Sequence, residues 1–484
     1  MKNNLLLLLF TLVSPAIWAI DDYEITVLIS NYEQDKLLLA HNVGSTIFVD
    51  DTVSVNQNGT FTFEAKKDLA AGIYLLVMPP ENEFIEVFLT ETDRQFSVAF
   101  DATTLAENAV FENAPDNSLF YEYLEFMRIT RPKMEKLIQT IQEGRAANVN
   151  VDAEEKALKT LEQELAGFKK NIIDKHPEKL TTTILKSSQQ IDIPAFEGDE
   201  MEVRLLEYVY RKNHYFDPIR HDKRFFRSKI CYDMITFYMD NLTVPQPDSV
   251  IQSVYEVLQL VAPDTVAFKS YFYQYLNKYY GSDLMGMDAV FVHMVKEYTL
   301  KGKTDFISEE SRAKITQEAL LWDKTLIGRT APNLEHYLLD IEKSIPLKDA
   351  EDENRRFALA GQTDLNSVSK PYTVVVFWAP DCSHCKESMP HIVDFYEHHQ
   401  TEVEVFAVCH TDFRQFGDCA QKLQDYNATK WINTVDPYYK YIKDYHIETT
   451  PLILVLDANK KVVYKRIGAE QLELALEQMK KRSK

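Results

Sequence analysis

Two cysteines separated by two residues are the side chains of this sequence best suited to chemistry. Cys382 and Cys385 lie in the segment Trp378-Ala-Pro-Asp-Cys-Ser-His-Cys385, after the apolar run 372–377 and before a helix-like stretch. A strand that ends in such a pair at the start of a helix places the first sulfur near amide N–H groups and the positive end of the helix dipole. Both stabilise a thiolate, so the pattern predicts thiol-disulfide exchange.

The bulk composition limits the other classes of function. The chain has 484 residues, enough for about three domains with their own hydrophobic cores. Its formal net charge is -21, from 53 basic and 74 acidic residues, and no basic stripe interrupts this balance for long. Nucleic acids and anionic lipid surfaces are therefore poor partners.

The N-terminal residues have the layout of a secretory signal peptide, which we assign to residues 1–19. Lys2 supplies the positive start, residues 5–13 are apolar, and the segment ends on the small residue Ala19. That run is too short to span a bilayer, and no other run of 18 or more apolar residues follows. We expect a protein exported to the periplasm or a similar compartment and soluble after signal cleavage.

Residues 21–112 have the pattern of an antiparallel β-sandwich-like domain. The dipeptide Asn58-Gly59 lies between two alternating runs and predicts a hairpin. Regular spacing of short alternating runs is typical of a sandwich. The predicted strands are residues 24–29, 36–40, 52–55, 60–63, 72–77 and 83–88.

Residues 113–325 form the predicted central all-α domain, because the apolar spacing changes to a helical period near residue 116. A helical hairpin is expected first, and Asp152 with Glu155 has the spacing of a capping box at the start of its second helix. Further helices are predicted at residues 201–211, 223–241, 250–260, 264–280, 287–300 and 309–324.

Strands and helices alternate in residues 326–484, which predicts an α/β domain. We expect strands at residues 372–377, 403–408, 452–456 and 461–466, and helices at residues 382–399, 413–426 and 470–481. The cysteine pair then lies between the first of these strands and the first helix.

Three separated signals in this domain resemble the thioredoxin superfamily. They are the segment from Phe377 to Cys385, Pro390 eight residues after the first cysteine, and Thr450-Pro451 just before a strand. The opening Gly328-x-x-Ala-Pro-Asn333 and the extra segment before Trp431 resemble its TlpA/ResA, AhpC/TSA-related branch. Envelope proteins of the Bacteroidota carry such a domain behind β and helical accessory domains. The resemblance covers about residues 326–484 and implies a thioredoxin fold.

By this resemblance Cys382 is the exposed nucleophile and Cys385 the buried resolving thiol. Thr450 and Pro451 correspond to the cis-proline loop, which can pair with an extended substrate chain. A cationic His384 beside Cys382 would stabilise its thiolate and move the pair toward oxidising potentials.

Trp378 is the aromatic residue of the motif and a second group expected to tune the pair. Thioredoxins carry a buried acid two residues before this tryptophan, where this chain has Val376. TlpA/ResA-type members often have a glutamate at the position of Ser388, beside Glu387. Glu387 is therefore our candidate for deprotonating Cys385.

The resemblance also implies the partners and cofactors. The expected reaction is most often reductive, with a disulfide donor as the alternative direction. It uses the Cys382–Cys385 disulfide itself and no other cofactor. Its partners would be protein thiols and disulfides of the cell envelope and a membrane electron donor or acceptor. Residues 21–325 would select substrates or form a homodimer.

Other interpretations of the remaining cysteines and of the site stay open. A zinc site would use Cys382, Cys385, Cys409 and His410, without the second close ligand pair usual for such sites, so we expect no metal. Cys409 and Cys419 could form a second disulfide, but a strand end and a helix would hold them beyond bonding distance, so we expect packed free thiols there. For Cys231 we expect a buried position in a helix.

Two other functions are the main alternatives. A peroxide-reducing AhpC/TSA-type antioxidant protein needs a Thr or Ser three residues before its reactive cysteine, where this chain has Ala379. The second alternative is an envelope protein that binds a partner and in which the redox domain is secondary. About two thirds of the chain has no chemical motif, which is compatible with such a role.

Overall fold

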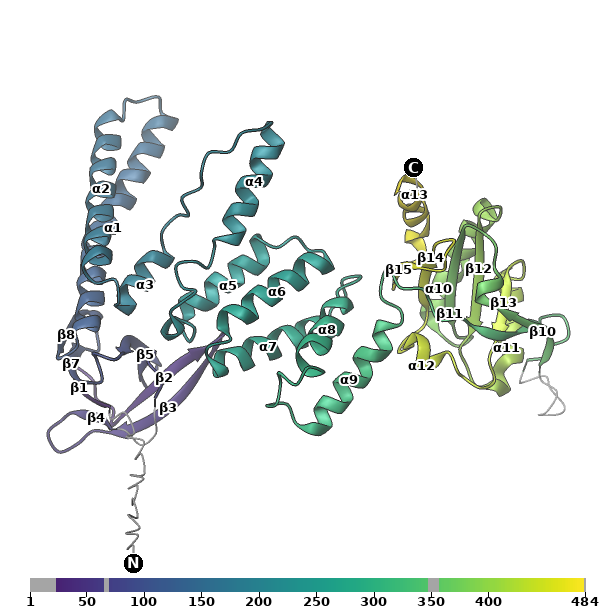
Figure 1. Ribbon diagram of the computed structural model, residues 1–484, viewed down its shortest axis with the longest axis horizontal. Helices are drawn as coiled ribbons and strands as arrows, with labels where there is room; N and C mark the ends of the chain where they lie inside the picture. The colour runs from purple at the N-terminus through teal and green to yellow at the C-terminus, as the bar shows by residue number, and fades with distance from the viewer. Residues whose placement is uncertain (1–22, 65–68, 347–356, 483–484) are drawn as a thin grey trace, which may run out of the picture. The chain divides into compact units, whose positions relative to one another are not determined.

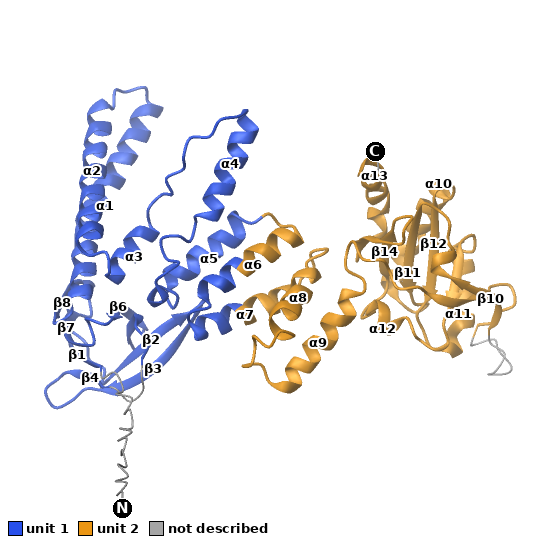
Figure 2. Cartoon of the chain, in the orientation of Figure 1, with its two compact units in different colours: residues 1–243, 256–271 blue, residues 244–255, 272–484 orange. Residues whose placement is uncertain are grey.

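The computed structural model describes residues 23–64, 69–346 and 357–482. The chain divides into two compact units, which Figure 2 shows in different colours. Unit 1 comprises residues 1–243 and 256–271, and unit 2 comprises residues 244–255 and 272–484. The expected signal peptide lies outside the described residues.

Unit 1 begins with two four-stranded sheets whose inner faces share one hydrophobic core. One sheet has the order β4-β1-β7-β8 and the other β3-β2-β5-β6. Strand β1 pairs in parallel with β7, and the other pairings are antiparallel. The strands are β1 (Glu24–Ser30), β2 (Lys36–Val43), β3 (Thr46–Ser54), β4 (Phe61–Glu64), β5 (Gly72–Met78), β6 (Glu83–Leu89), β7 (Gln95–Asp101) and β8 (Leu105–Glu112).

The sandwich-like domain is confirmed, but its expected hairpin is wrong. A turn forms at Asn58-Gly59, where Gly59 has φ +78° and donates its N–H to the carbonyl of Asn56 at 3.0 Å. The strands on either side, β3 and β4, then enter different sheets. The turn chemistry predicts the reversal of the chain, whereas burial of the apolar faces decides the pairing.

Helices follow from Pro115. They are α1 (Pro115–Ala146), α2 (Asp152–Lys175), α3 (Leu180–Ser187), α4 (Glu200–Asn213), the 3-10 turn η1 (Lys223–Phe225) and α5 (Lys229–Asn241). Helices α1 and α2 form the predicted hairpin and lie side by side (Figure 1), with the rings of Phe126 and Phe168 stacked at 4.4 Å. The predicted helix 223–241 is broken, because Ser228 caps a new helix there through the N–H of Cys231.

The predicted capping box at the start of α2 is wrong. Val151 is the N-cap, so Asp152 is already inside the first turn and cannot cap it. The side chain of Asn150 accepts the N–H of Asp152 at 2.8 Å instead. Glu155 pairs with Arg145 of α1 at 2.7 Å, which joins the two helices of the hairpin.

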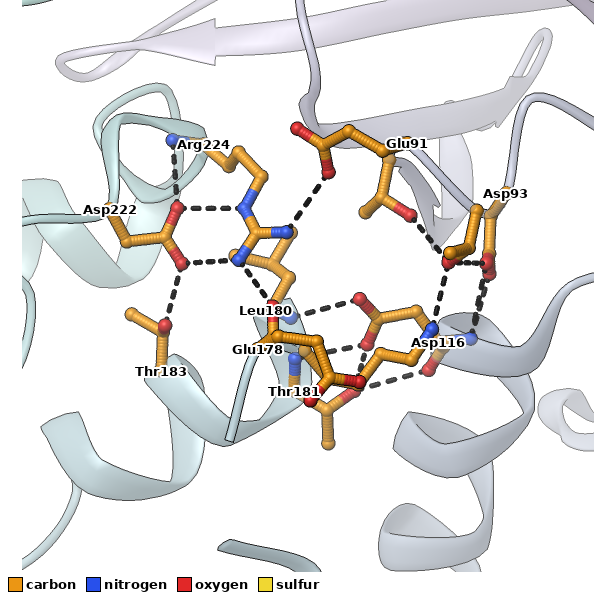
Figure 3. Close-up of polar contacts among 12 residues, drawn as sticks. Glu91, Asp93, Asp116, Glu178, Leu180, Thr181, Thr183, Asp222 and Arg224 are labelled. Atoms are coloured by element: carbon orange, nitrogen blue, oxygen red, sulfur yellow. Dashed lines mark hydrogen bonds and ion pairs between the residues drawn. The ribbon is translucent and has the colours of Figure 1, made fainter. Parts of the chain in front are cut away.

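A buried polar junction joins the sheets of unit 1 to its helices (Figure 3). The carboxylate of Asp93 accepts the N–H groups of Asp116 and Asn117 at the start of α1. The carboxylate of Asp116 accepts the N–H groups of Leu180 and Thr181 at the start of α3, at 2.9 and 3.1 Å. Neither α1 nor α3 has a local side-chain cap. The two distant carboxylates therefore accept the free N–H groups at the starts of these helices.

Arg224 closes this junction on its other side. Its guanidinium binds both carboxylate oxygens of Asp222, and donates to the carbonyl of Glu178 and to Glu91 (Figure 3). Burial raises the pKa of Asp222, but hydrogen bonds from Arg224 and Thr183 outweigh it and leave this pKa below the ordinary value. The buried charge is therefore paired, as a stable buried ion pair requires.

Helices α6 (Pro247–Val261) and α7 (Thr265–Tyr280) have residues in both units. Unit 2 continues with α8 (Asp288–Met294), the π-helical turn η2 (Val295–Thr299) and α9 (Glu309–Asp323). The predicted helix 287–300 is thus an α-helix that ends in a π turn. Trp322 of α9 is buried between the rings of Tyr280 and Phe291.

A seven-stranded mixed sheet forms the C-terminal domain of unit 2, in the order β10-β9-β13-β12-β11-β14-β15. Its strands are β9 (Glu335–Asp340), β10 (Ala358–Asp364), β11 (Tyr372–Trp378), β12 (Val403–Cys409), β13 (Ile432–Val435), β14 (Leu452–Leu456) and β15 (Val462–Lys465). Its helices are α10 (Ser383–His399), α11 (Phe416–Asp425), α12 (Ile442–Tyr445) and α13 (Leu472–Arg482). The predicted α/β architecture is confirmed, with β9, β10 and β13 as additional strands.

Side chains of β11 point alternately into two hydrophobic cores, one on each face of this sheet. Val374, Val376 and Trp378 belong to one core, and Val375 and Phe377 to the other. Burial on both faces explains the unbroken apolar run of the sequence. No helix within the described ranges is long and apolar enough to cross a membrane.

Candidate redox site

The cysteine pair lies where the central strand of this sheet ends. Strand β11 runs between β12, which is parallel to it, and β14, which is antiparallel. After Trp378 the chain turns, and Cys382 becomes the N-cap of α10. The first turn of this helix therefore carries both cysteines at the edge of a rigid sheet, as sequence analysis predicts.

Cys382 and Cys385 form a disulfide, with Cα atoms 5.2 Å apart. The Cys382 side chain is half-buried, whereas Cys385 is 1% exposed. The N–H of Cys385 points at the Cys382 sulfur, 3.1 Å away. A thiolate at Cys382 would thus have a hydrogen bond and the helix dipole to stabilise it, and a partner sulfur close behind it.

Thr450 and Pro451 lie against the accessible sulfur. Their peptide bond is cis, as the resemblance implies, and the carbonyl oxygen of Thr450 is 3.2 Å from the Cys382 sulfur. Both residues are partly exposed, and the neighbouring Thr449 is exposed. The structure therefore brings the proposed substrate-binding residues to the proposed nucleophile.

Cys385 has apolar surroundings. It belongs to the same buried cluster as Val376, Trp378 and Met389. Val376 is 1% exposed and occupies the place where a buried acid is expected in a thioredoxin. Glu387, the candidate for deprotonating Cys385, is exposed on α10, and no contact with Cys385 is found in the described part of the chain. Its role stays a prediction.

The other two residues expected to tune the pair differ in exposure. His384 is exposed in the first turn of α10 and faces solvent. Trp378 is 1% exposed, and its carbonyl accepts the N–H of His410 at 2.7 Å. Trp378 therefore fixes the end of β11 against the end of β12, while His384 is accessible to solvent.

Cys409 and Cys419 form a second disulfide, so the expectation of free thiols was wrong. Their Cα atoms are 6.4 Å apart, and both side chains are buried. A 3-10 turn at Phe413–Gln415 returns the chain so that α11 packs beside the end of β12. Cys231 is a buried free thiol in α5, as predicted, and burial raises the pKa of its thiol.

The second disulfide also removes the zinc alternative. Cys409 is bonded to Cys419, and the His410 ring is hydrogen bonded to the Tyr441 hydroxyl at 2.9 Å. Burial lowers the pKa of His410. Within the ranges that the structure describes, no three His, Cys, Asp or Glu residues converge as metal ligands.

A groove beside the cis-proline loop was missed by sequence reasoning. Its volume is about 460 Å³. Part of its lining comes from the C-terminal domain, as Ser388, Glu448, Thr449, Pro451 and Arg466. Asp283 reaches it from the connection between α7 and α8. No signal in the sequence indicates this groove, because Asp283 and the other lining residues lie far apart in the chain.

Comparison with protein-family models agrees with this geometry. Residues 349–481 match the Redoxin family, and residues 23–120 match a domain of unknown function, DUF4369. The C-terminal domain, with its mixed sheet and cysteine pair, thus matches the Redoxin family and has a thioredoxin-like fold. It makes the chain a thioredoxin-like oxidoreductase.

Several solved structures are similar to parts of the chain. A thioredoxin-like protein from Bacteroides caccae is 16% identical, covers 60% of this chain and 99% of its own, and has a TM-score of 0.39. A domain of a possible thiol-disulfide isomerase from Cytophaga hutchinsonii is 26% identical, with coverage of 32% and 95% and a TM-score of 0.26. A putative thiol:disulfide interchange protein DsbE from Chlorobium tepidum is 19% identical, with coverage of 32% and 97% and the same TM-score, 0.26. No curated protein matches the chain.

Proposed function

We propose that this thioredoxin-like oxidoreductase is exported and exchanges its Cys382–Cys385 dithiol and disulfide with protein substrates, mainly as a reductant. One observation carries the proposal. The half-buried sulfur of Cys382 caps α10 and lies 3.2 Å from the carbonyl of Thr450 at a cis-proline, with Cys385 buried behind it.

In the reductive direction the Cys382 thiolate attacks one sulfur of a substrate disulfide. That S–S bond breaks, a Cys382–substrate disulfide forms, and the leaving sulfur takes up a proton. Cys385 then loses its proton and attacks the Cys382 sulfur, which releases the second substrate sulfur as a thiol. Two electrons pass from the dithiol to the substrate, and the Cys382–Cys385 disulfide is formed.

The residues around the pair have separate tasks in this cycle. The N–H of Cys385 holds the negative charge of the Cys382 thiolate. Thr450 and Pro451 present backbone to an extended substrate and position its sulfur. The reaction needs no bound cofactor, but each turnover requires a dithiol that reduces the pair again. In an exported protein a membrane electron donor would supply those electrons.

Export is supported by the signal-like N-terminus and by the second disulfide. Buried structural disulfides such as Cys409–Cys419 are typical of oxidising compartments. A homodimer through residues 21–325 remains a prediction, and sedimentation equilibrium of the mature protein tests it.

The direction of electron flow is tested by the redox state of the pair. Thiol alkylation of the protein in its native compartment should show Cys382 and Cys385 mostly reduced. Equilibration of the purified protein with dithiothreitol buffers then gives the reduction potential. A mostly oxidised pair in the cell would instead indicate a disulfide donor.

Peroxide reduction is the control reaction for this proposal. Ala379 provides no hydroxyl group three residues before Cys382. Stopped-flow mixing with hydrogen peroxide should therefore give slow oxidation of Cys382. Fast turnover that depends on Cys382 would favour the peroxidase alternative.

A further inference from the structure

The connection between α7 and α8 forms part of the groove beside the redox site. Residues 281–287 make this connection, and Asp283 lines the groove together with Ser388 and residues of the cis-proline loop. The next two residues, Leu284 and Met285, expose 65% and 42% of their surface. A segment of the helical region therefore presents a charge in the groove and apolar surface at the next two positions of the chain.

This connection is held against the C-terminal domain by a buried ion pair. Asp288, at the start of α8, pairs with Lys465 of β15, and their side chains are only 10% and 7% exposed. Lys465 also donates to the carbonyl of Thr325 at 3.1 Å. Burial lowers the pKa of Lys465 and Asp288 opposes that shift, which is the balance expected of a buried pair.

The chain just before the ion-paired Asp288 is also closely packed. Gly286 has φ +86°, and a Cβ atom there would lie 3.1 Å from Pro247 and 3.3 Å from Ile327. Glycine is thus required for both conformation and space. Gly286 and Asp288 therefore fix the end of the connection that carries Asp283.

Two residues that line the groove, His446 and Arg466, also contact Trp322 of α9. The ring of Trp322 lies 5.6 Å from the ring of His446. The guanidinium of Arg466 lies over the same Trp322 ring, 5.7 Å from its centre. Glu448 is hydrogen bonded to His446 at 3.0 Å. Arg466 and Glu448, two charged side chains that the C-terminal domain contributes to the groove, thus each have a partner within unit 2.

Asp283 is the charge that these contacts leave available. It is exposed, and no ion pair of Asp283 occurs among the residues that the structure describes. An unpaired carboxylate at the rim of a groove attracts a basic side chain of an incoming chain. A surface pair of this kind is weak and weakens further with salt.

We propose that residues 281–287 form the second wall of a substrate groove, and that Asp283 favours polypeptides with Lys or Arg close to the reacting cysteine. The inference rests on the proposed thiol-disulfide exchange. The groove flanks Thr450, whose carbonyl contacts the Cys382 sulfur, so a chain bound there continues directly into the site of exchange. A polypeptide in extended form is the expected occupant, because Thr449 and Pro451 of the cis-proline loop line the groove and such a loop can pair with an added strand.

Two synthetic peptide disulfides test this proposal. They differ only in carrying Lys or Glu beside the cysteine, and each is mixed with the reduced full-length protein. At low ionic strength the rate constant should be about threefold larger for the Lys peptide. Asp283→Lys should invert that ratio to about one third, and Asp283→Asn should bring it near one. In 0.5 M salt, a concentration at which the screening length is only about 4 Å, all three ratios should approach one.

The matched control is Asp305→Lys. Asp305 is another exposed acid of unit 2 that does not line the groove. This variant changes the net charge equally and should keep the wild-type ratio. A ratio that is the same in the wild-type and Asp283→Lys proteins overturns the groove proposal. If the wild-type protein reduces neither peptide, the proposed exchange function itself fails.

Discussion

The polar junction of unit 1 and the redox site of unit 2 both use side chains that accept N–H groups at the start of a helix. In the junction, the carboxylates of Asp93 and Asp116 accept the free N–H groups at the starts of α1 and α3, respectively, and both carboxylates are fully buried. In the redox site the acceptor at the start of α10 is the half-buried sulfur of Cys382. The same helix-capping interaction is therefore shielded from solvent in the junction and accessible to solvent in the redox site.

The difference shows what separates a structural cap from a reactive one. Each buried carboxylate of the junction accepts several hydrogen bonds and is closed off from solvent, so it is not open to an incoming partner. Cys382 receives one N–H and stays accessible, with a second sulfur behind it. We therefore expect changes in the junction to affect stability and changes at Cys382 to affect reaction rate.

The largest effect is expected for Cys382→Ser. Serine keeps a cap for α10 but has no nucleophilic sulfur, so the rate of peptide disulfide reduction should fall at least about a thousandfold. The free energy of unfolding of the reduced protein should change by less than about 1 kcal/mol. Retained exchange activity would show that another thiol performs the reaction.

Asp116→Ala is the corresponding change in the junction. It leaves the N–H groups of Leu180 and Thr181 buried without acceptors, so unfolding should become easier by about 3–5 kcal/mol. Urea denaturation of the whole protein measures this loss, with hydrogen exchange of the amide groups of unit 1 as the readout. Glu125→Ala on α1 is the control, since its exposed pair with Arg128 contributes less than about 1 kcal/mol. Equal effects of the two variants would contradict the comparison.

A buried histidine of the C-terminal domain should make its stability depend on pH. Burial lowers the pKa of His336 to about 4, below the value of about 6.5 in an unfolded chain. The unfolded state then binds the proton more readily, so stability is complete above pH 6.5 and falls toward pH 4. The difference of about 2.5 pKa units corresponds to about 3 kcal/mol.

His336→Asn tests this origin of the pH dependence. Unfolding free energies at pH 7 and pH 4 should differ by about 3 kcal/mol less in the variant than in the wild type. His384→Asn is the control, because His384 is exposed. An unchanged difference in His336→Asn would assign the pH dependence to other groups.

The smallest effect concerns the second disulfide. Cys409 and Cys419 are 10 residues apart, so the loop entropy that their bond removes from the unfolded state is worth about 2.5 kcal/mol. Replacing both by Ala should destabilise the C-terminal domain by about that amount. Cys231→Ala should leave the response of stability to reducing agents unchanged, because Cys231 is in no disulfide. A stability loss below about 0.5 kcal/mol would leave this disulfide without a structural role.

The parts of the redox site that sequence analysis predicts are those set by local chemistry. The strand before Trp378, the helix after Cys382 and the loop at Thr450-Pro451 all follow from residues close to one another in the sequence. Strand spacing likewise predicts the sandwich of unit 1. Helix α1 could be predicted from the helical period, although its cap could not.

The features that sequence analysis misses depend on contacts between distant residues. Asp116 caps a helix that begins 64 residues later, and no spacing in the sequence indicates this. The disulfide of Cys409 and Cys419 depends on how tightly the chain returns after β12. The pairing of β3 and β4 with other strands, rather than with each other, depends on the shared core of the two sheets.

Trapping of the reaction intermediate tests the central claim most directly. In Cys385→Ser the second step of the exchange is blocked, so a peptide disulfide should leave one peptide bound to Cys382. Mass spectrometry of the intact protein and of its proteolytic fragments should find a single adduct, located on Cys382. An adduct on another cysteine, or none, would contradict the account of Cys382 as the exchanging nucleophile.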